Sequence, residues 1–363
     1  MDHANESGTF NESVLNLSCE DVADAVKTLY NVTVKSVKKL YGYDDLNFRI
    51  NSHNESFVLK VKQQKYDGAS QQAVLTKKIM KHLNADGFRV PVAVTTINGK
   101  DVTASYVFGD NKTQRQLEMF TYLPGKSILE LKLSPEILVD TARDVGVLFG
   151  SVTKSLEKLN NLLSIENDVV SSSDIWQTQN FPQVRSYLHF VKDKNLNMVI
   201  CEVFDAFAAM FPSLKKQLNR GTCNRKCLIH GDFSTTNVIV EKLGQEMGVI
   251  DFEDSTLSYR VFDLSVCIGY MMVSALDVKA DPMLLIKNLY QGYASVASPL
   301  NSGEKEILFV AVQARLATSY IMSRYTLSLH PENEKYLDWQ SSKCPKLLLL
   351  LHFKGKEQTL REW

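Results

Sequence analysis

Hydrophobic and polar positions alternate in short segments through the first third of the chain, a pattern that predicts strands. After a helix that begins near Ser18, the alternation predicts an antiparallel meander of three strands between Val34 and Val61. Apolar residues then recur at helical spacing over 69–84, and Gly87 suits the C-terminal cap of that helix. Further strands are expected at 88–94, 102–108 and 115–122.

Beyond Leu123-Pro124-Gly125 the spacing of the apolar positions becomes mostly helical. Ser134, Pro135 and Glu136 form a typical helix start, with an N-cap residue, a first-turn proline and an acid at the positive end of the helix dipole. A β-like interval between Cys227 and Phe252 interrupts the helical pattern. Further helices are expected at 183–194, 197–218, 261–276, 282–297 and 303–329.

These elements predict an α+β fold of two lobes, similar in plan to a protein kinase. A small antiparallel β lobe is expected over 18–123, and a larger, mainly helical lobe over 124–343. A flexible polar tail, residues 1–17, precedes the first lobe. The role of the C-terminal segment, 344–363, is left open.

The composition narrows the possible classes of function. The 363 residues are 44% hydrophobic and 23% charged, which is ordinary globular usage. Lys and Arg total 41, as do Asp and Glu, so no global field attracts nucleic acid or a membrane surface. The chain shows no signal-peptide pattern and no apolar run of the ~20 residues that a membrane span needs, so a cytoplasmic protein with six reduced cysteines is expected.

The β-like interval carries the candidate chemistry, in the sequence LIHGDFSTTNVIVEKLGQEMGVIDFED. Phosphoryl transfer requires a group that orients the hydroxyl nucleophile and metal ions that neutralise the phosphate charge. Asp232 can accept the hydroxyl proton. Asn237 and Asp251 offer hard oxygen donors suited to Mg²⁺, and a hairpin of two strands would bring both beside one nucleotide.

The spacing of these residues resembles the catalytic loop and the metal-binding Asp of protein kinases. Gly231 replaces the arginine of H-R-D, and Glu253 replaces the glycine of D-F-G, so the chain resembles instead the small-molecule kinases of the aminoglycoside phosphotransferase and choline kinase family. Four further segments are similar to the hydroxylysine kinase branch of that family: GYDDLNF at 42–48, TYLPGKSI at 121–128, HGDFSTTNVIV at 230–240 and HPENEKYL at 330–337. The resemblance implies transfer of a phosphoryl group from a nucleoside triphosphate, GTP in this branch, to the hydroxyl of 5-hydroxylysine during lysine degradation.

The resemblance also implies a nucleotide site in the first lobe. Lys60 matches the strand lysine that contacts the phosphates, although a solvated strand lysine is the alternative. Tyr122 and Leu123 match the hinge that reads the purine, and Tyr43 and Asp44 lie in the turn that would cover the phosphates. The helix expected at 69–84 contains no acid to pair with Lys60, which leaves Gln71, Gln72 or an acid from elsewhere as its partner.

Two residues are expected to support the loop that carries Asp232. His230 is interpreted as a buried scaffold residue in preference to a catalyst. Asp263 either holds the backbone of that loop or only complements the start of a helix. For a small amino acid substrate, Glu253 and Asp254 are candidates for the ammonium group, or they lie near the metal, and Arg260, Arg315 and Arg324 are candidates for the carboxylate. Trp176 could form a wall of the substrate pocket, although a tryptophan of the core is the favoured alternative.

Two other functions fit the same residues. One is a kinase for a different small hydroxylated amine, such as choline, homoserine or an aminoglycoside. The other is a nucleotide-binding pseudokinase that acts as an interaction module, which the missing helix acid and the single glycine of the turn at 42–45 would explain. The expected partners are a nucleotide, Mg²⁺ and a small molecule, with no nucleic acid or membrane and no prediction of oligomeric state.

Overall fold

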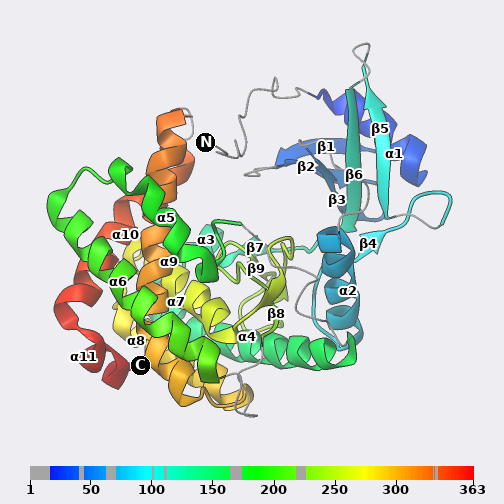
Figure 1. The fold of residues 1–363 in the computed structure, drawn as a ribbon. Coiled ribbons are helices and arrows are strands. Elements are labelled where there is room, and N and C mark those ends of the chain that lie inside the picture. Colours follow the sequence, from blue (N-terminus) through cyan, green and yellow to red (C-terminus); the bar gives the residue numbers. More distant parts are fainter. Residues whose placement is uncertain are drawn as a thin grey trace. The chain divides into compact units, whose positions relative to one another are not determined.

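The computed structural model describes residues 17–40, 45–62, 71–99, 102–109, 113–163, 174–217, 226–329, 331 and 334–363. The described residues form two compact units. The first unit takes those within Met1–Ser70 and Pro91–Tyr122, and the second takes those within Gln71–Val90 and Leu123–Trp363. A sheet with a helix on one face makes up the first unit, and a bundle of helices around short strands makes up the second (Figure 1).

The first unit contains a six-stranded antiparallel sheet. Its order is β1-β2-β3-β6-β4, with β5 also paired to β6. The predicted meander is confirmed, and the strand expected at 88–94 is reduced to β4. The strands are β1 (Ser36–Leu40), β2 (Leu46–Asn51), β3 (Ser56–Val61), β4 (Ala93–Val94), β5 (Thr103–Phe108) and β6 (Thr113–Thr121).

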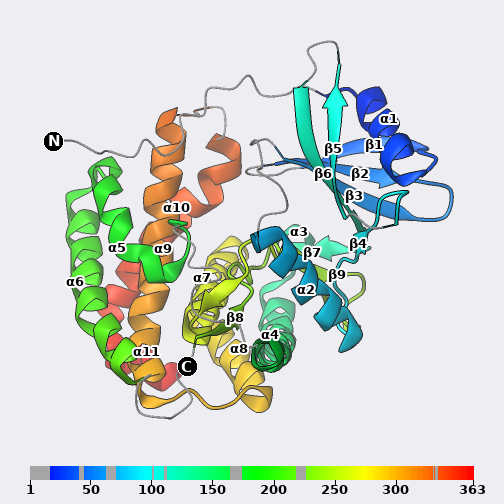
Figure 2. The same cartoon turned by 45° about the vertical axis from the view of Figure 1, so that its right-hand side comes forward.

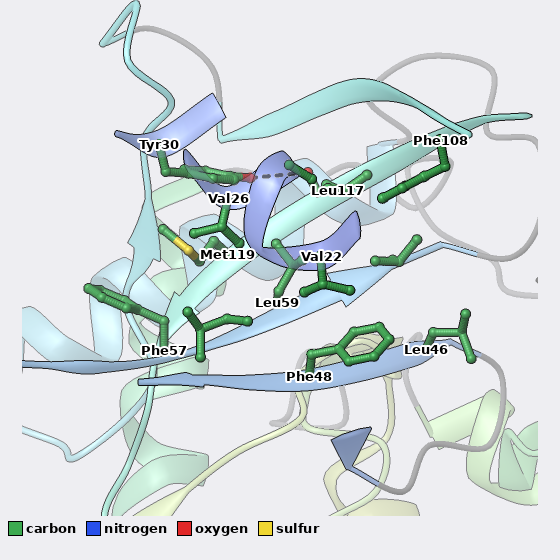
Figure 3. Packing of buried hydrophobic residues seen from close by; sticks show 13 residues of the cluster. Val22, Val26, Tyr30, Leu46, Phe48, Phe57, Leu59, Phe108, Leu117 and Met119 are labelled. Atoms are coloured by element: carbon green, nitrogen blue, oxygen red, sulfur yellow. Dashed lines mark hydrogen bonds between the residues drawn. The ribbon is translucent and has the colours of Figure 1, made fainter. Parts of the chain in front are cut away.

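Helix α1 (Cys19–Tyr30) covers one face of this sheet. Ser18 caps the helix through a capping box with Asp21, and it is the helix start that the sequence predicts. Buried side chains of α1 meet the alternate residues of β2, β3 and β6 that point to the same face (Figure 3). The hydroxyl of Tyr30 donates to the backbone oxygen of Leu117 over 3.4 Å. The core of the first unit therefore lies between α1 and the sheet.

Helix α2 (Gln71–Ala85) belongs to the second unit, whereas the sequence places it in the first lobe. The side chain of Gln72 donates to the backbone oxygens of Glu253 (2.7 Å) and Ser255 (2.5 Å), and Thr76 donates to that of Phe252 (3.1 Å). These hydrogen bonds join α2 to a segment far along the chain, so the lobe boundary cannot be a single point in the sequence.

The helices of the second unit occur close to where their apolar spacing predicts them. Helix α9 packs on α6, α7 and α10, and α4 packs on α8 (Figure 2). The helix expected at 183–194 is instead α5 followed by the 3-10 helix η2. The bounds are α3 (Ile128–Leu131), α4 (Pro135–Leu163), η1 (Thr178–Asn180), α5 (Phe181–Val184), η2 (Arg185–Phe190), α6 (Lys194–Gln217), α7 (Arg260–Asp277), α8 (Pro282–Val296) and α9 (Ser302–Leu329).

Five short strands lie among these helices. β9 (Val238–Val240) pairs with β10 (Gly248–Val249) and with β7 (Lys126–Ser127), and β8 (Cys227–Ile229) pairs with β11 (Thr256–Ser258). All these pairs are antiparallel. The sequence predicts the β-like interval from Cys227 to Phe252, which contains β8, β9 and β10, but it predicts neither β7 nor β11.

The C-terminal residues continue the helical bundle. α10 (Glu334–Lys354) runs without a break across residue 343, where the sequence analysis ends the second lobe, and α11 (Lys356–Glu362) follows. Cys344, Leu347, Leu348 and Leu351 of α10 have no exposed surface. The end of the chain is therefore part of the core of the second unit. Within the described residues, no helix is both long and apolar enough to span a membrane.

Candidate active site

A compact loop after β8 holds the first two predicted site residues. β8 is buried along its length, and loop 230–237 leads from it into β9. The backbone amide of Ser234 donates to the oxygen of Asp232 (2.8 Å), and the amide of Asn237 donates to the oxygen of Ser234 (3.0 Å). The turn brings the side chains of Asp232 and Asn237 together.

Asn237 donates its side-chain amide to Asp232. Its Nδ2 lies 2.9 Å from the backbone oxygen of Asp232 and 2.8 Å from Oδ2 of the carboxylate. Because the amide nitrogen is committed to these two acceptors, the amide oxygen of Asn237 is directed elsewhere. That oxygen is a hard neutral donor of the kind that Mg²⁺ accepts.

The β9–β10 hairpin brings Asp251 next to Asn237. The amide of Ile250, one residue past the paired segment, donates to the backbone oxygen of Asn237 over 3.0 Å. Asp251 follows with a φ of +65° and an exposed side chain. Left-handed backbone is uncommon outside glycine, and it occurs at helix C-caps as well as at functional sites. Three residues that are separated in the sequence thus meet at the ends of one loop and one hairpin.

His230 joins the loop to the hairpin. Its Nε2 lies 3.1 Å from the backbone oxygen of Ile250, and the amide of Asp232 donates to its Nδ1 over 3.2 Å. Since Nδ1 accepts, the proton is on Nε2, and the neutral ring donates to Ile250. Burial lowers the pKa of His230 to about 4, although the negative charge of Asp251 opposes that shift. These contacts suit a scaffold, because the ring is neutral near pH 7.

Asp263 accepts two hydrogen bonds from the loop backbone. Its Oδ2 receives the amide of His230 and its Oδ1 the amide of Gly231, each over 2.9 Å. Asp263 lies in the first turn of α7 and is 2% exposed. Burial raises the pKa of Asp263 to about 7, and the two amide donors oppose the rise. Both alternatives for this residue therefore have a geometric basis, since it is at a helix start and it holds the loop.

Arg315 reaches Asp232 from helix α9. Nη2 of Arg315 lies 3.1 Å from Oδ1 of Asp232 and 3.1 Å from the hydroxyl of Tyr270, and Nη1 donates to the backbone oxygen of Trp176 over 2.7 Å. Burial raises the pKa of Asp232, and the charge of Arg315 and a hydrogen bond from Asn237 oppose the rise. Arg315 therefore lies beside Asp232, and Trp176 contacts Arg315 through its backbone oxygen.

Asp254 adds another carboxyl group to the same region. The Cβ of an alanine at Gly231 would lie 2.2 Å from the backbone oxygen of Asp254, so the two segments touch. Burial raises the pKa of Asp254 well above its usual range, and the negative charges of Asp232, Asp251 and Asp174 raise it further. Such a group of carboxylates attracts cations. The neighbouring Glu253 is half-buried, and its backbone oxygen accepts from α2.

Two of the predicted arginines are not in this group. Arg260 is 6% exposed and makes a bidentate pair with Glu304, with both distances 2.8 Å, and it also donates to the backbone oxygens of Ser298 and Pro299. Its guanidinium is therefore committed to the protein interior. Arg324 lies on α9, like Arg315, and is exposed.

The predicted nucleotide residues are divided between the two units. Lys60 is half-buried on β3 of the first unit, on the face opposite α1, with Glu118 of β6 directly across from it. Tyr122 ends the same unit, and its ring lies 4.0 Å from the guanidinium carbon of Arg49. Leu123 begins the stretch of the second unit that follows and packs against Gly248. Tyr43 and Asp44 lie outside the described residues, as does the side chain of Gln71.

Several contacts of the site are not foreseen from the sequence. Gln72 and Thr76 hold the backbone after Asp251, whereas the sequence analysis considers Gln72 only as a partner for Lys60. Tyr270 bridges Arg315 to Ser319. Tyr270 and Ser319 are hydroxyl residues within largely apolar stretches of α7 and α9, which is a sequence signal for a buried hydrogen bond but does not name the partner.

The described residues contain no cluster of three or more His, Cys, Asp or Glu side chains that could hold a metal by themselves. A magnesium ion in a kinase takes few protein ligands and completes its shell with phosphate oxygens and water. The oriented amide oxygen of Asn237 and the exposed carboxylate of Asp251 match that requirement. Both would hold the metal only together with a nucleotide.

A family model described as the phosphotransferase enzyme family matches residues 39–298. The chain belongs to this family. Hydroxylysine kinase of Xenopus laevis is 30% identical over 364 residues, which cover 96% of this chain and 93% of that protein. Hydroxylysine kinase of Danio rerio is 30% identical over 359 residues, or 97% and 96% of the two chains. The resemblance drawn from the sequence motifs is confirmed.

Solved structures agree with the fold of this phosphotransferase. A microcompartment-associated aminopropanol kinase has a TM-score of 0.65 at 15% identity, over 94% of this chain and 99% of the other. An amicoumacin kinase, solved with AMP-PNP, Ca²⁺ and Ami, has a TM-score of 0.61 at 13% identity, over 90% and 93%. The predicted two-lobed α+β kinase fold is confirmed. Family and relatives support an enzyme that transfers a phosphoryl group from a nucleotide to a hydroxyl group of a small molecule.

Proposed function

We propose that this phosphotransferase transfers the γ-phosphoryl group of GTP to the hydroxyl of 5-hydroxy-L-lysine, with Mg²⁺ as cofactor, in lysine degradation in the cytoplasm. The observation that carries the proposal is the meeting of Asp232, Asn237 and Asp251, with the amide of Asn237 oriented by Asp232. Two relatives that align along nearly the whole chain are named hydroxylysine kinase, which supports hydroxylysine as the acceptor.

Asp232 is the proposed base. The substrate hydroxyl oxygen forms a bond to the γ-phosphorus, the bond from that phosphorus to the β,γ-bridging oxygen breaks, and the hydroxyl proton passes to Oδ of Asp232. The nucleoside diphosphate leaves with the bridging oxygen. Asn237 and Asp251 are the proposed ligands of Mg²⁺, which when bound neutralises charge on the phosphate oxygens. Their position next to Asp232 supports this assignment.

The negative charge around Asp254 supports a cationic acceptor. In 5-hydroxylysine the reacting hydroxyl is on the carbon next to the one that carries the ε-ammonium. A hydroxyl at Asp232 therefore requires an ammonium site close by, and Asp254, whose charge acts on the same region, is the proposed partner, with Glu253 beside it. An ammonium ion there would favour the ionised form of Asp254 and offset its burial.

The nucleotide contacts are proposed on positional grounds. Lys60 is assigned to the phosphates because it occupies the strand position of the family's lysine, with Glu118 across the strand pair as an acid in place of the missing helix acid. Tyr122 and Leu123 are assigned to the purine through their backbone groups. Tyr43 and Asp44 are assigned to the phosphates from their place in the turn.

An acceptor and donor panel tests this function. The purified protein is incubated with Mg²⁺, GTP or ATP, and hydroxylysine, lysine, choline, homoserine, ethanolamine or an aminoglycoside, and products are measured by mass spectrometry. We expect phosphohydroxylysine, more rapidly with GTP, and no product with lysine, which lacks the hydroxyl. Asp232→Asn should reduce the rate about 10²- to 10⁴-fold.

The panel also separates the alternatives. Asp251→Ala should abolish transfer, while Asp205→Asn, at an exposed ion pair on α6, should leave the rate unchanged. Transfer to choline or an aminoglycoside but not to hydroxylysine would reject the acceptor and keep the reaction class. Wild-type rates in Asp232→Asn would reject the assignment of the base.

A further inference from the structure

Arg315 is a buried cation in the middle of α9. It is 4% exposed, so its guanidinium has lost nearly all of its hydration and depends on protein partners. Those partners are the carboxylate of Asp232, the hydroxyl of Tyr270 and the backbone oxygen of Trp176. The rings of Tyr270 and Trp176 also lie 5.1 Å and 5.5 Å from its guanidinium carbon. Arg315 is therefore held in one place by neighbours on several elements.

Both oxygens of the Asp232 carboxylate accept hydrogen bonds from side chains. Arg315 donates to Oδ1 over 3.1 Å, and Asn237 donates to Oδ2 over 2.8 Å. The final torsion of an aspartate side chain is broad when nothing holds it. Two donors on opposite oxygens, one from the loop and one from a helix 83 positions away, select one orientation of the carboxylate plane.

The same contacts argue against Arg315 as a ligand for a substrate carboxylate. A carboxylate binds arginine best through two adjacent N–H groups. Both terminal nitrogens of Arg315 already have protein acceptors, and its Nε is buried without a hydrogen-bond partner among the described residues. Each pair of adjacent N–H groups includes one from Nη2, so a substrate carboxylate bound by two of them would have to displace Asp232 or the hydroxyl of Tyr270.

Tyr270 and Ser319 hold Arg315 in position. The hydroxyl of Tyr270, on α7, lies 3.1 Å from Nη2 of Arg315 and 3.0 Å from the hydroxyl of Ser319, one turn further along α9. All three side chains are buried. This chain of contacts connects the packing of α7 and α9 to the position of the guanidinium.

We propose that Arg315 is a positioning residue for Asp232: it fixes the orientation in which that carboxylate receives the substrate hydroxyl. The proposal rests on the proposed role of Asp232 and goes beyond it, because it assigns to α9 a part in the chemical step. It also removes Arg315 from the residues that bind the acceptor.

A double-mutant cycle tests the assignment. Rates of phosphoryl transfer are measured for wild type, Asp232→Asn, Arg315→Met and the double variant, with Arg361→Gln, at an exposed ion pair on α11, as the control. Loss of carboxylate orientation should lower kcat of Arg315→Met about 100-fold, with little change in KM for hydroxylysine. In the Asp232→Asn background the same substitution should lower kcat less than about 3-fold, because its target is gone.

If Arg315→Met lowered kcat by the same factor in wild type and in Asp232→Asn, the proposal would be overturned. The proposal would also fail if Arg315→Met raised KM for hydroxylysine but not for the analogue of hydroxylysine that lacks the α-carboxylate. That result would identify Arg315 as a ligand for the substrate carboxylate. If Arg315→Met does not fold, Arg315→Lys and Tyr270→Phe replace it, with expected losses of about 10-fold in kcat and the same dependence on Asp232.

The assignment of the acceptor can fail without the proposal for Arg315 failing. If wild type phosphorylates another acceptor from the panel, the cycle is run with that acceptor and still decides the role of Arg315. If Asp232→Asn has the wild-type rate, the assignment of the base and the proposal for Arg315 both fall.

Discussion

Gly231 combines a left-handed backbone conformation with a close approach to another backbone segment, and Gly231→Ala tests whether the site depends on both. Gly231 immediately precedes Asp232 and has a φ of +87°. The Cβ of an alanine at this position would lie 2.2 Å from the backbone oxygen of Asp254 and 2.7 Å from its carbonyl carbon. Both contacts are with backbone, so no change of side-chain rotamer can relieve them.

The expected effect has two parts. A left-handed conformation costs a non-glycine residue about 1–2 kcal/mol. Overpacking against fixed atoms adds about 1–3 kcal/mol, so the free energy of unfolding should fall by about 2–5 kcal/mol. Relief of the overlap also moves the loop by roughly 1 Å, and a displacement of that size at a reacting group can reduce the rate about 100-fold.

Gly244→Ala supplies the matched control. Gly244 has a similar φ of +75°, and nothing lies within 4 Å of a Cβ built there, so this variant carries the backbone effect alone. Urea unfolding and the rate of phosphoryl transfer are measured for both variants. If the two lose the same free energy of unfolding and Gly231→Ala turns over at the wild-type rate, the close approach of Gly231 to Asp254 does not constrain the site.

Three further predictions each test a single feature of the second unit. The folded state keeps His230 neutral down to about pH 4 while the unfolded chain protonates it near pH 6.5, so the contribution of His230 to the free energy of unfolding should fall by about 2 kcal/mol as the pH is lowered from 7 to 5. His230→Gln should remove that part of the slope in urea titrations at several pH values, and an unchanged slope would show that the ring titrates normally. Arg260→Met leaves the buried Glu304 without its cation and should reduce the free energy of unfolding by about 3–5 kcal/mol. The double variant Arg260→Met with Glu304→Leu should lose much less. Equal losses of the two variants in urea titrations would mean that the pair is not buried as described. Asn237→Ala should raise the Mg²⁺ concentration for half-maximal rate at least about tenfold, and an unchanged Mg²⁺ titration would remove Asn237 from the metal site.

The sequence alone is sufficient for the parts of the molecule that depend on local spacing. Alternation predicts β1, β2 and β3, and helical spacing predicts α6 to α9, because each element must turn its apolar side chains toward one face. Asp232, Asn237 and Asp251 are predictable for a related reason. They lie at the ends of a short loop and a hairpin, so chain connectivity itself keeps them close.

The tertiary structure decides the contacts between elements that are distant in the sequence. Apolar periodicity says which face of a helix is buried but not what it is buried against. Arg260 and Arg315 are therefore equivalent in the sequence analysis, whereas packing commits the first to Glu304 and places the second on Asp232. Helix α2 joins the second unit for the same reason, because its polar side chains find their acceptors in backbone that comes much later in the chain.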